Sequence, residues 1–209
     1  MKSLFVTGIG TSVGKTITAC VLAEALRADY WKPVQCGDLG NSDTDIIRKL
    51  ISNTKTVFHK ETFAFKTPAS PHLAASLEGV DICLNDFELP KSKNIIIIEG
   101  AGGLMVPLNN KGDMMIDLIK HLGSDVIIVS QNYLGSINHT LLTYNALKIA
   151  NVKIAGIVFN GDENIETESF ILKYTGLPNI GNVRTEETFT KELILNYAAS
   201  FNINLIKHN

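Results

Sequence analysis

The clearest indication of the fold of this chain is the stretch Gly8-Ile9-Gly10-Thr11-Ser12-Val13-Gly14-Lys15-Thr16. It follows the apolar run Leu4–Val6 and precedes an apolar helix candidate, Ile17–Ala28. A glycine-rich turn between a strand and a helix that ends in Gly-Lys-Thr is typical of a phosphate-binding loop, because backbone N–H groups and the helix N-terminus hold phosphate oxygens there. Five residues separate Gly8 from Gly14, where the standard pattern has four. The stretch therefore predicts a nucleotide site of a longer-loop subgroup.

Two alternatives to this interpretation remain open from the loop itself. The loop could be a glycine-rich turn whose lysine is merely solvated. It could also belong to a partitioning-type ATPase switch, but such a switch carries an additional lysine that would fall at position 10, which here is Gly10. Within the predicted site, Lys15 would reach the β- and γ-phosphates and the Thr16 hydroxyl would coordinate Mg²⁺.

The rest of the chain predicts an α/β fold. Short β-branched runs without alternation indicate buried parallel strands. Helical spacing of apolar residues lies between them, and Asp113 is a plausible N-cap for one such helix. Strands that alternate with helices imply a mainly parallel sheet with helices on both faces, so we expect one P-loop NTPase-like domain over residues 1–209. The strand runs are 4–6, 95–98, 126–129 and 154–159, and the helix stripes are 115–122, 142–150 and 189–197, the last with Glu186 and Glu187 near its start.

Composition excludes some classes of function. The formal net charge is −2, and hydrophobic residues make up 45 % of the 209 residues, so neither a nucleic-acid nor an anionic-membrane footprint is evident. Three cysteines, Cys20, Cys36 and Cys83, are an odd number without metal-ligand spacing. Free thiols favour a reducing compartment, and we expect a cytoplasmic protein.

Acidic residues at two loop positions are candidates for holding Mg²⁺ beside the phosphates. Glu99 follows the strand run 95–98 directly and precedes a glycine-rich segment, where a solvated turn residue is the alternative. Asp43 precedes a helix pattern, where a helix N-cap is the alternative. Asp45 could exchange roles with Asp43, since spacing does not choose between them.

Six segments in order carry a resemblance to a known family. Besides the loop, they are Trp-Lys-Pro-Val at 31–34, Asn-Ser-Asp at 41–43, Ser-Pro-His at 70–72, Glu-Gly-Ala-Gly-Gly at 99–103 and Leu-Gly-Ser-Ile-Asn-His at 134–139. With these, the chain resembles the dethiobiotin synthetases from residue 8 to about residue 160, and that family carries the longer loop.

The resemblance implies a ring-closing carbon–nitrogen ligase of biotin biosynthesis. Such an enzyme takes 7,8-diaminopelargonate, CO₂ and ATP with Mg²⁺, and gives dethiobiotin, ADP and phosphate. It works as a homodimer with a substrate loop supplied by the neighbouring subunit. The alternatives are a partitioning-type ATPase switch and a cobyrinate-synthetase-like ligase, although the latter requires a glutaminase domain for which this chain has no room.

The resemblance also implies roles for individual residues. The implied catalytic residues are Lys15, Lys32 and Thr11, and the implied Mg²⁺ ligands are Thr16, Asp43 and Glu99. The implied nucleotide-binding residues are Gly10, Thr11, Ser12, Val13, Gly14, Lys15, Thr16, Ile17 and Asn160, of which Asn160 would contact adenine. The implied substrate-binding residues are Thr11, Lys32, Cys36, Gly100, Ala101, Gly102, Leu134, Gly135, Ser136 and Asn138.

The chain departs from the family pattern at three places. Gly10 stands where the family often has Asp, and Cys36 where it usually has a hydroxyl residue. The segment Gly181–Arg184 replaces a Gly-x-Ile-Pro-like sequence beside the base. His72 and His139 have no reactive Ser or Cys to pair with, so we expect both to be satisfied structurally.

Overall fold

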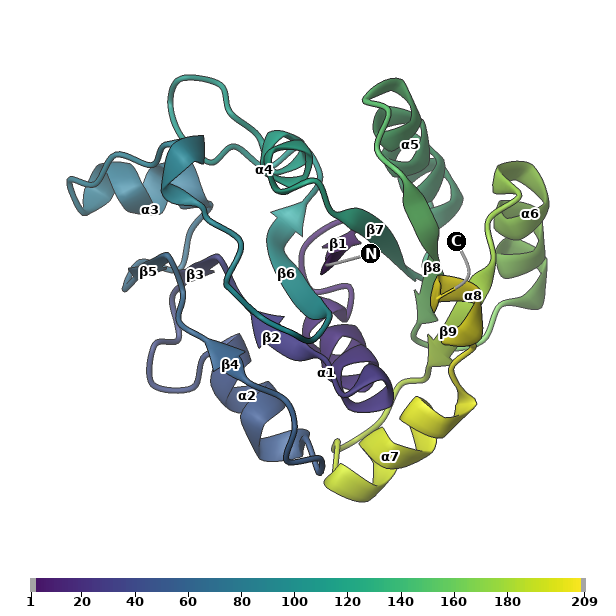
Figure 1. Cartoon of the computed structure of the whole chain (residues 1–209). Coiled ribbons are helices and arrows are strands. Elements are labelled where there is room, and N and C mark those ends of the chain that lie inside the picture. The colour runs from purple at the N-terminus through teal and green to yellow at the C-terminus, as the bar shows by residue number, and fades with distance from the viewer. Residues whose placement is uncertain (1–2, 208–209) are drawn as a thin grey trace.

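The fold is built on a seven-stranded sheet in the order β4-β2-β6-β1-β7-β8-β9, and every neighbouring pair in it is parallel (Figure 1). The computed structural model describes residues 3–207. β1 (Ser3–Gly8) is the central strand, with β6 (Ile96–Gly103) on one side and β7 (Asp125–Gln131) on the other. In such a sheet, ligands bind beyond the carboxyl ends of the strands, at the point where the strand order reverses. A ligand site is therefore expected beyond the carboxyl end of β1.

The other elements are as follows. The strands are β2 (Asp29–Trp31), β3 (Val34–Cys36), β4 (Phe58–His59), β5 (Phe63–Phe65), β8 (Ile154–Asn160) and β9 (Asn179–Val183), with β3 and β5 forming a separate parallel pair. The helices are α1 (Lys15–Leu26), α2 (Asp43–Leu50), α3 (Pro71–Leu77), α4 (Met115–Leu122), α5 (Ser136–Ile149), α6 (Ile165–Thr175), α7 (Lys191–Ser200) and α8 (Asn204–Lys207), with a short 3-10 turn η1 (Leu84–Asp86).

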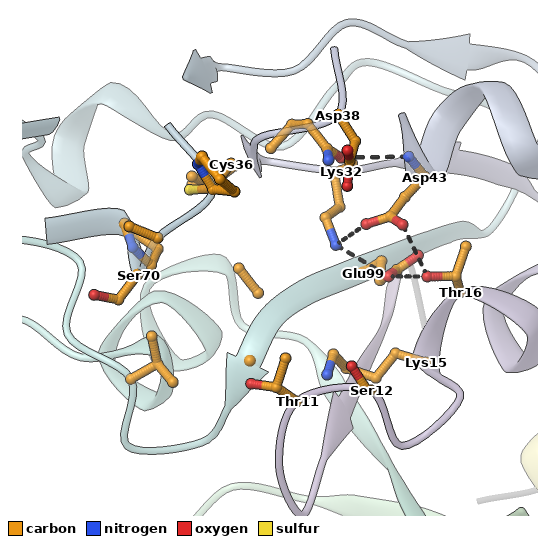
Figure 2. Close-up of a pocket in the computed structure, with 18 of the residues that line it drawn as sticks. Thr11, Ser12, Lys15, Thr16, Lys32, Cys36, Asp38, Asp43, Ser70 and Glu99 are labelled. Atoms are coloured by element: carbon orange, nitrogen blue, oxygen red, sulfur yellow. Dashed lines mark hydrogen bonds and ion pairs between the residues drawn. The ribbon is translucent and has the colours of Figure 1, made fainter. Parts of the chain in front are cut away.

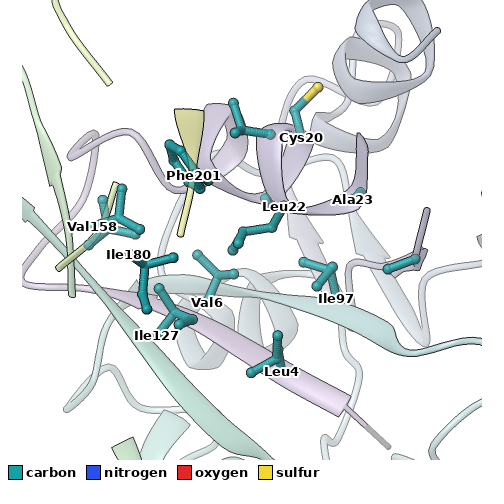
Figure 3. Packing of buried hydrophobic residues seen from close by; sticks show 14 of the residues in the cluster. Leu4, Val6, Cys20, Leu22, Ala23, Ile97, Ile127, Val158, Ile180 and Phe201 are labelled. Atoms are coloured by element: carbon teal, nitrogen blue, oxygen red, sulfur yellow. The ribbon is translucent and has the colours of Figure 1, made fainter. Parts of the chain in front are cut away.

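Two apolar layers cover the sheet, one on each face. On one face, α1 packs on the sheet with α2 and α7 beside it, and Leu22 of α1 belongs to the same buried cluster as Val6 and Ile97 of the strands (Figure 3). On the other face, α4, α5 and α6 pack against strand residues such as Phe5 and Ile128. Burial of these aliphatic side chains is the main favourable term in folding. The predicted α/β class, with a parallel sheet covered on both faces, is confirmed.

The four predicted strand runs are confirmed in β1, β6, β7 and β8, but two helix starts were wrong. Met114, not Asp113, is the N-cap of α4, because Asp117 reaches back to the Met114 N–H. Thr190 caps α7 and accepts from the Leu193 N–H, so the predicted third helix begins later than expected. No helix within residues 3–207 is long and apolar enough to cross a bilayer.

Helix α5 presents its apolar stripe to the outside rather than to the core. Leu142 and Ile149 are exposed, whereas Thr140, Thr143 and Leu147 face the sheet. The periodicity therefore predicted the helix correctly but not the side of it that is buried within this chain.

Asp29 anchors both ends of the segment 53–94, which contains only short elements, to the sheet. It lies at the start of β2 and is 2 % exposed. Its carboxylate accepts hydrogen bonds from the Val57 N–H at 3.0 Å and the Asn94 side chain at 2.9 Å. Ser92 donates to it as well, and the His59 ring lies 3.3 Å away. Burial opposes the charge, but the hydrogen bonds from Asn94, Ser92 and Val57 outweigh it and hold the pKa of Asp29 below its ordinary 3.8.

Replacing Asp29 with asparagine is expected to lower the free energy of unfolding at neutral pH by about 1–3 kcal/mol, because hydrogen bonds to a charged acceptor are lost. The folded-state pKa lies below the unfolded one, so the folded protein binds fewer protons under acidic conditions. The stabilising contribution is therefore complete above pH 3.8 and is lost as the pH falls through the folded-state pKa. Urea unfolding at several pH values measures it.

Asp125→Asn is the matched control. Asp125 also begins a strand, but its carboxylate forms a long ion pair of 3.4 Å with Lys153, whose side chain is half-exposed. Its effect is expected to stay within about 0.5 kcal/mol. An equal loss in both variants, or a loss at Asp29 that does not shrink in acid, would contradict the anchoring role.

Candidate functional site

A cleft of about 700 Å³ opens at the carboxyl end of β1, between the phosphate-loop stretch and the loops after β3 and β6 (Figure 2). Loops at this edge of a parallel sheet are the usual place for a ligand. The cleft is lined by Thr11, Ser12, Gly14, Lys15, Thr16, Ile17, Lys32, Val34, Gln35, Cys36, Asp38, Asp43, Pro68, Ala69, Ser70, Pro71, Glu99, Ala101, Gly102 and Val106.

The end of the phosphate loop requires glycine. Gly14 has φ +90° and precedes the first residue of α1, a left-handed conformation that side chains rarely adopt. A Cβ there would also lie 2.4 Å from the Asn160 amide nitrogen. Asn160 ends β8 and donates to the Val13 carbonyl at 3.1 Å. Asn160, which the sequence predicted as the adenine contact, therefore lies directly against the loop. The side chain of Val13 is buried in the core.

Lys15 is buried inside the loop. Its Nζ donates to the Gly10 carbonyl at 2.8 Å, and the residue is 7 % exposed. Burial lowers the pKa of Lys15 from 10.5 to about 8; the Glu99 carboxylate raises it and the neighbouring Lys32 lowers it further. A phosphate group would provide the anionic partner that this lysine lacks in the loop.

Three oxygen-bearing side chains converge beside Lys15. The Thr16 hydroxyl lies 2.8 Å from Glu99 Oε1 and 3.1 Å from Asp43 Oδ1 (Figure 2). They come from α1, β6 and α2, which are far apart in the sequence. Two carboxylates and a hydroxyl next to a phosphate loop are the hard oxygen donors that Mg²⁺ prefers, so these residues fit the ion. Within the described part of the chain, no group of three or more His, Cys, Asp and Glu residues has metal-site geometry.

Lys32 lies between the two carboxylates. Its Nζ is 2.6 Å from Asp43 Oδ2, 3.0 Å from Glu99 Oε1 and 3.2 Å from the Gly100 carbonyl. The lysine is 4 % exposed and Glu99 is 1 % exposed. Burial opposes the charge of Lys32, but Glu99 and Asp43 outweigh burial and raise its pKa. Lys32 is therefore a fixed cation that neutralises part of the acidic pair.

The two aspartates of the 41–45 segment have separate positions. Ser42 is the N-cap of α2, and the Asp45 carboxylate accepts from the Ser42 N–H in a capping box. Asp43 is the first helical residue and points its carboxylate at Lys32 and Thr16. Burial would raise the pKa of Asp43, but Lys32 and then Thr16 outweigh it and hold it below 3.8. The alternatives left open by the sequence, that Asp43 is the N-cap or that Asp45 takes its place, are wrong.

Glu99 was expected just after a strand, and here the structure differs. It lies within β6, opposite Val6 of β1, because the strand continues to Gly103. The glycine-rich residues that follow Glu99 are therefore strand residues, and Ala101 and Gly102 line the cleft.

Cys36 lies in the wall of the cleft as a free thiol. Burial raises the pKa of Cys36 from 9.0 to about 11, despite the opposing charge of Lys32. The residue therefore stays protonated at neutral pH and is not an activated nucleophile. His72 and His139 are satisfied as expected, by the Ser70 hydroxyl at 3.0 Å and the Tyr133 hydroxyl at 2.7 Å.

The segment Leu134–Asn138 does not line this cleft in the described chain. Gly135, with φ +102°, is the N-cap of α5 and provides no side-chain cap. Ser136 and Asn138 are both helical residues of α5, and neither is its cap. Leu134 is fully exposed on the surface.

Sequence reasoning missed several residues of the site. Gln35 accepts from the Asp43 N–H at 3.4 Å, and Tyr30 donates to Glu99 Oε2 at 2.8 Å. Asp38 and Val106 line the cleft as well. None of these residues had a signal in the sequence, because a tyrosine or glutamine in a short strand does not indicate which distant residue it will contact.

The amino-acid sequence is similar to those of known proteins over nearly its whole length. A family model described as an AAA domain matches residues 2–192. The ATP-dependent dethiobiotin synthetase BioD of Christiangramia forsetii is 48 % identical over 200 residues, 96 % of this chain and 96 % of that protein. That of Cytophaga hutchinsonii is 49 % identical over 199 residues, 95 % of this chain and 96 % of its own.

This chain belongs to the dethiobiotin synthetase family.

Solved structures with the same fold are more distant from this dethiobiotin synthetase family member. The MinC:MinD cell division protein complex of Aquifex aeolicus matches with a TM-score of 0.60 at 10 % identity, covering 100 % of this chain and 97 % of the other. A ParA family ATPase of Chlorobium tepidum matches with a TM-score of 0.54 at 14 % identity, covering 95 % and 98 %. At such low identity these matches show a shared P-loop fold alone.

Proposed function

We propose that this protein is an ATP-dependent dethiobiotin synthetase, a ligase of biotin biosynthesis. The observation that carries the proposal is near-full-length identity of 48–49 % to proteins of that name. The cleft supports it, because it combines a phosphate loop with a second buried cation, Lys32, and an acidic pair. We further propose that residues 1–209 act as one domain, supported by the packing of α7 on α1.

ATP is the proposed phosphoryl donor. Its phosphates would take the N–H groups of the loop from Gly10 to Ile17, and Lys15 would turn from the Gly10 carbonyl to the β- and γ-phosphates. Asn160 would contact adenine with an amide that both donates and accepts. The segment Gly181–Arg184 would lie beside the base, and its Arg184 forms an ion pair with Glu163 at 2.7 Å.

Thr16, Asp43 and Glu99 are the proposed magnesium ligands. When bound, the ion would offset charge on the ATP phosphates. The three side chains already lie together, because the Thr16 hydroxyl is within hydrogen-bond distance of both carboxylates.

The proposed reaction joins two amines of the substrate through the carbon of CO₂, and one phosphoryl transfer from ATP drives it. One amine of 7,8-diaminopelargonate adds to CO₂ and forms a carbamate. A carbamate oxygen attacks the γ-phosphorus and ADP leaves. The second amine then attacks the carbamate carbon, phosphate leaves, and the cyclic urea closes. Such a reaction depends on positioning and on neutralising charge, which Lys32 and Lys15 supply from fixed positions.

The proposed substrate site has a part from each of two subunits. Thr11, Lys32, Cys36 and the backbone of Gly100–Gly102 would face the carbamate end. Leu134, Gly135, Ser136 and Asn138 of the neighbouring subunit would bind the substrate carboxylate at the N-terminus of α5. The exposed stripe of α5 supports a homodimer, since Leu142 and Ala146 line an apolar groove of about 370 Å³ with the 103–106 loop. Three free cysteines support a cytoplasmic location.

The function is tested by phosphate release from Mg-ATP and bicarbonate, with and without 7,8-diaminopelargonate, with the product identified by mass. We expect release that requires the diamine and a product heavier than the diamine by CO₂ less one water. The same assay over a dilution series, beside sedimentation, should show specific activity falling as the dimer dissociates. Hydrolysis that ignores the diamine and yields no ring would overturn the proposal in favour of a nucleotide switch. Activity unchanged in a monomer would overturn the shared site.

A further inference from the structure

The Glu99 carboxylate is held from two sides by different parts of the molecule. Its Oε1 faces the cleft, with Thr16 at 2.8 Å and Lys32 at 3.0 Å. Its Oε2 points away from these two and accepts from the Tyr30 hydroxyl at 2.8 Å. A glutamate terminal torsion is soft and roughly two-fold, so the plane of a carboxylate is set by its partners rather than by its own rotamer.

Tyr30 is a rigid partner for this purpose. It lies in β2, next to β6 in the sheet and opposite Ile97, and is completely buried. Its ring packs against Phe58 with the centroids 6.0 Å apart. Tyr30 does not line the cleft, and its hydroxyl donates its hydrogen bond to the Glu99 carboxylate. A buried hydroxyl whose ring is fixed by packing can hold an acceptor in one orientation with little entropy left to lose.

We propose that Tyr30 is a positioning residue that sets the orientation of Glu99 for magnesium held with the nucleotide. The inference rests on the proposed function in taking Glu99 as a magnesium ligand. Tyr30 acts through Glu99 and touches neither nucleotide nor substrate. Without the hydroxyl, Glu99 Oε2 is buried without its donor, and the carboxylate turns toward Thr16 and Lys32 with both oxygens.

The test is Tyr30→Phe, which removes one oxygen and keeps the ring. Binding of the β,γ-imido analogue of ATP is measured by calorimetry with and without Mg²⁺. In wild-type protein we expect Mg²⁺ to tighten analogue binding. In Tyr30→Phe that tightening falls about tenfold, the scale of a lost hydrogen bond to a charged group, while affinity without Mg²⁺ stays at the wild-type value. A merely structural role would weaken binding equally with and without Mg²⁺.

Tyr144→Phe is the matched control, because the Tyr144 hydroxyl donates to the Thr175 carbonyl at 3.2 Å, away from the cleft. It should keep the full effect of Mg²⁺. In a Glu99→Gln background, Tyr30→Phe should cause no further loss, since the group through which it acts has changed. Tyr30→Met, which also lacks the donor, replaces Tyr30→Phe should that variant not fold.

The outcomes separate this inference from the proposed function. Wild-type protein that makes dethiobiotin while Tyr30→Phe keeps the full effect of Mg²⁺ overturns the role of Tyr30 alone. Absence of any effect of Mg²⁺ on wild-type binding overturns Glu99 as a ligand and the role of Tyr30 with it. Wild-type protein that binds Mg²⁺ and analogue as expected but makes no ring overturns the proposed reaction and leaves the inference standing.

Discussion

Turnover by Lys32→Ala is expected to fall about a thousandfold, the scale of removing a fixed group that stabilises charge in the transition state. Affinity for ADP without Mg²⁺ should change little, because Lys32 contacts the acidic pair and not the phosphate loop. Steady-state rates with the diamine and calorimetric titration with ADP measure the two quantities. The expected split between turnover and binding distinguishes a group that acts on the carbamate from one that holds the nucleotide.

Lys32→Ala also leaves two carboxylates facing each other. Breaking a buried ion pair costs about 3–5 kcal/mol, and the partial exposure of Asp43 favours the lower end. We therefore expect a lower melting temperature that Mg²⁺ partly restores. Lys120→Ala, which removes an exposed lysine of α4, is the control and should leave both rate and melting unchanged. Wild-type turnover in Lys32→Ala would remove the residue from the mechanism.

Lys15→Met is expected to lower both nucleotide affinity and turnover, the latter about a hundredfold to a thousandfold. The folded protein should not be destabilised by this change. Burial lowers the pKa of Lys15 to about 8, so its charged form is disfavoured in the folded state and stability rises with pH from about 8 to 10.5. At neutral pH, methionine removes that cost. The melting temperature without ligand is thus expected to stay equal or to rise.

Arg27→Met makes the same change of charge at the other end of the same helix, where Arg27 is exposed. It should leave nucleotide affinity unchanged. Titration with ADP and thermal unfolding of both variants test the prediction. Lys15→Met that binds ADP as tightly as wild type would refute a direct contact between Lys15 and the phosphates. Lys15→Met with a clearly lower melting temperature would refute the stability prediction.

The local sequence was sufficient for the central part of the fold. β1, the phosphate loop and α1 follow from an apolar run, a glycine-rich turn and an apolar helix, and these signals are local. Strands β6, β7 and β8 were equally visible because fully buried parallel strands are continuous apolar runs. Helix caps were less predictable. Asp113 looks like a cap by residue type, but Met114 takes the position because its backbone N–H meets Asp117.

The segment 53–94 was not predictable, because its order comes from distant partners. Asp29 holds Val57, Ser92 and Asn94 by hydrogen bonds between residues 28 or more positions apart. The buried face of α5 was not predictable either. Leu142 and Ile149 satisfy the helical spacing of a core stripe, yet they are exposed in the single chain. Spacing identifies an apolar side of a helix, but it does not say which surface covers that side.

Local sequence was enough to predict a strand, a phosphate loop and a helix in that order, together with lysines and acids suited to phosphate chemistry. The packing of distant elements was needed to show that Asp43 and not Asp45 joins Glu99, that Lys32 lies between the two carboxylates, and that Tyr30 holds the far oxygen of Glu99. The difference comes from distance along the chain. A loop is specified by neighbouring residues, whereas an ion pair or a buried hydrogen bond is specified by which strands lie side by side.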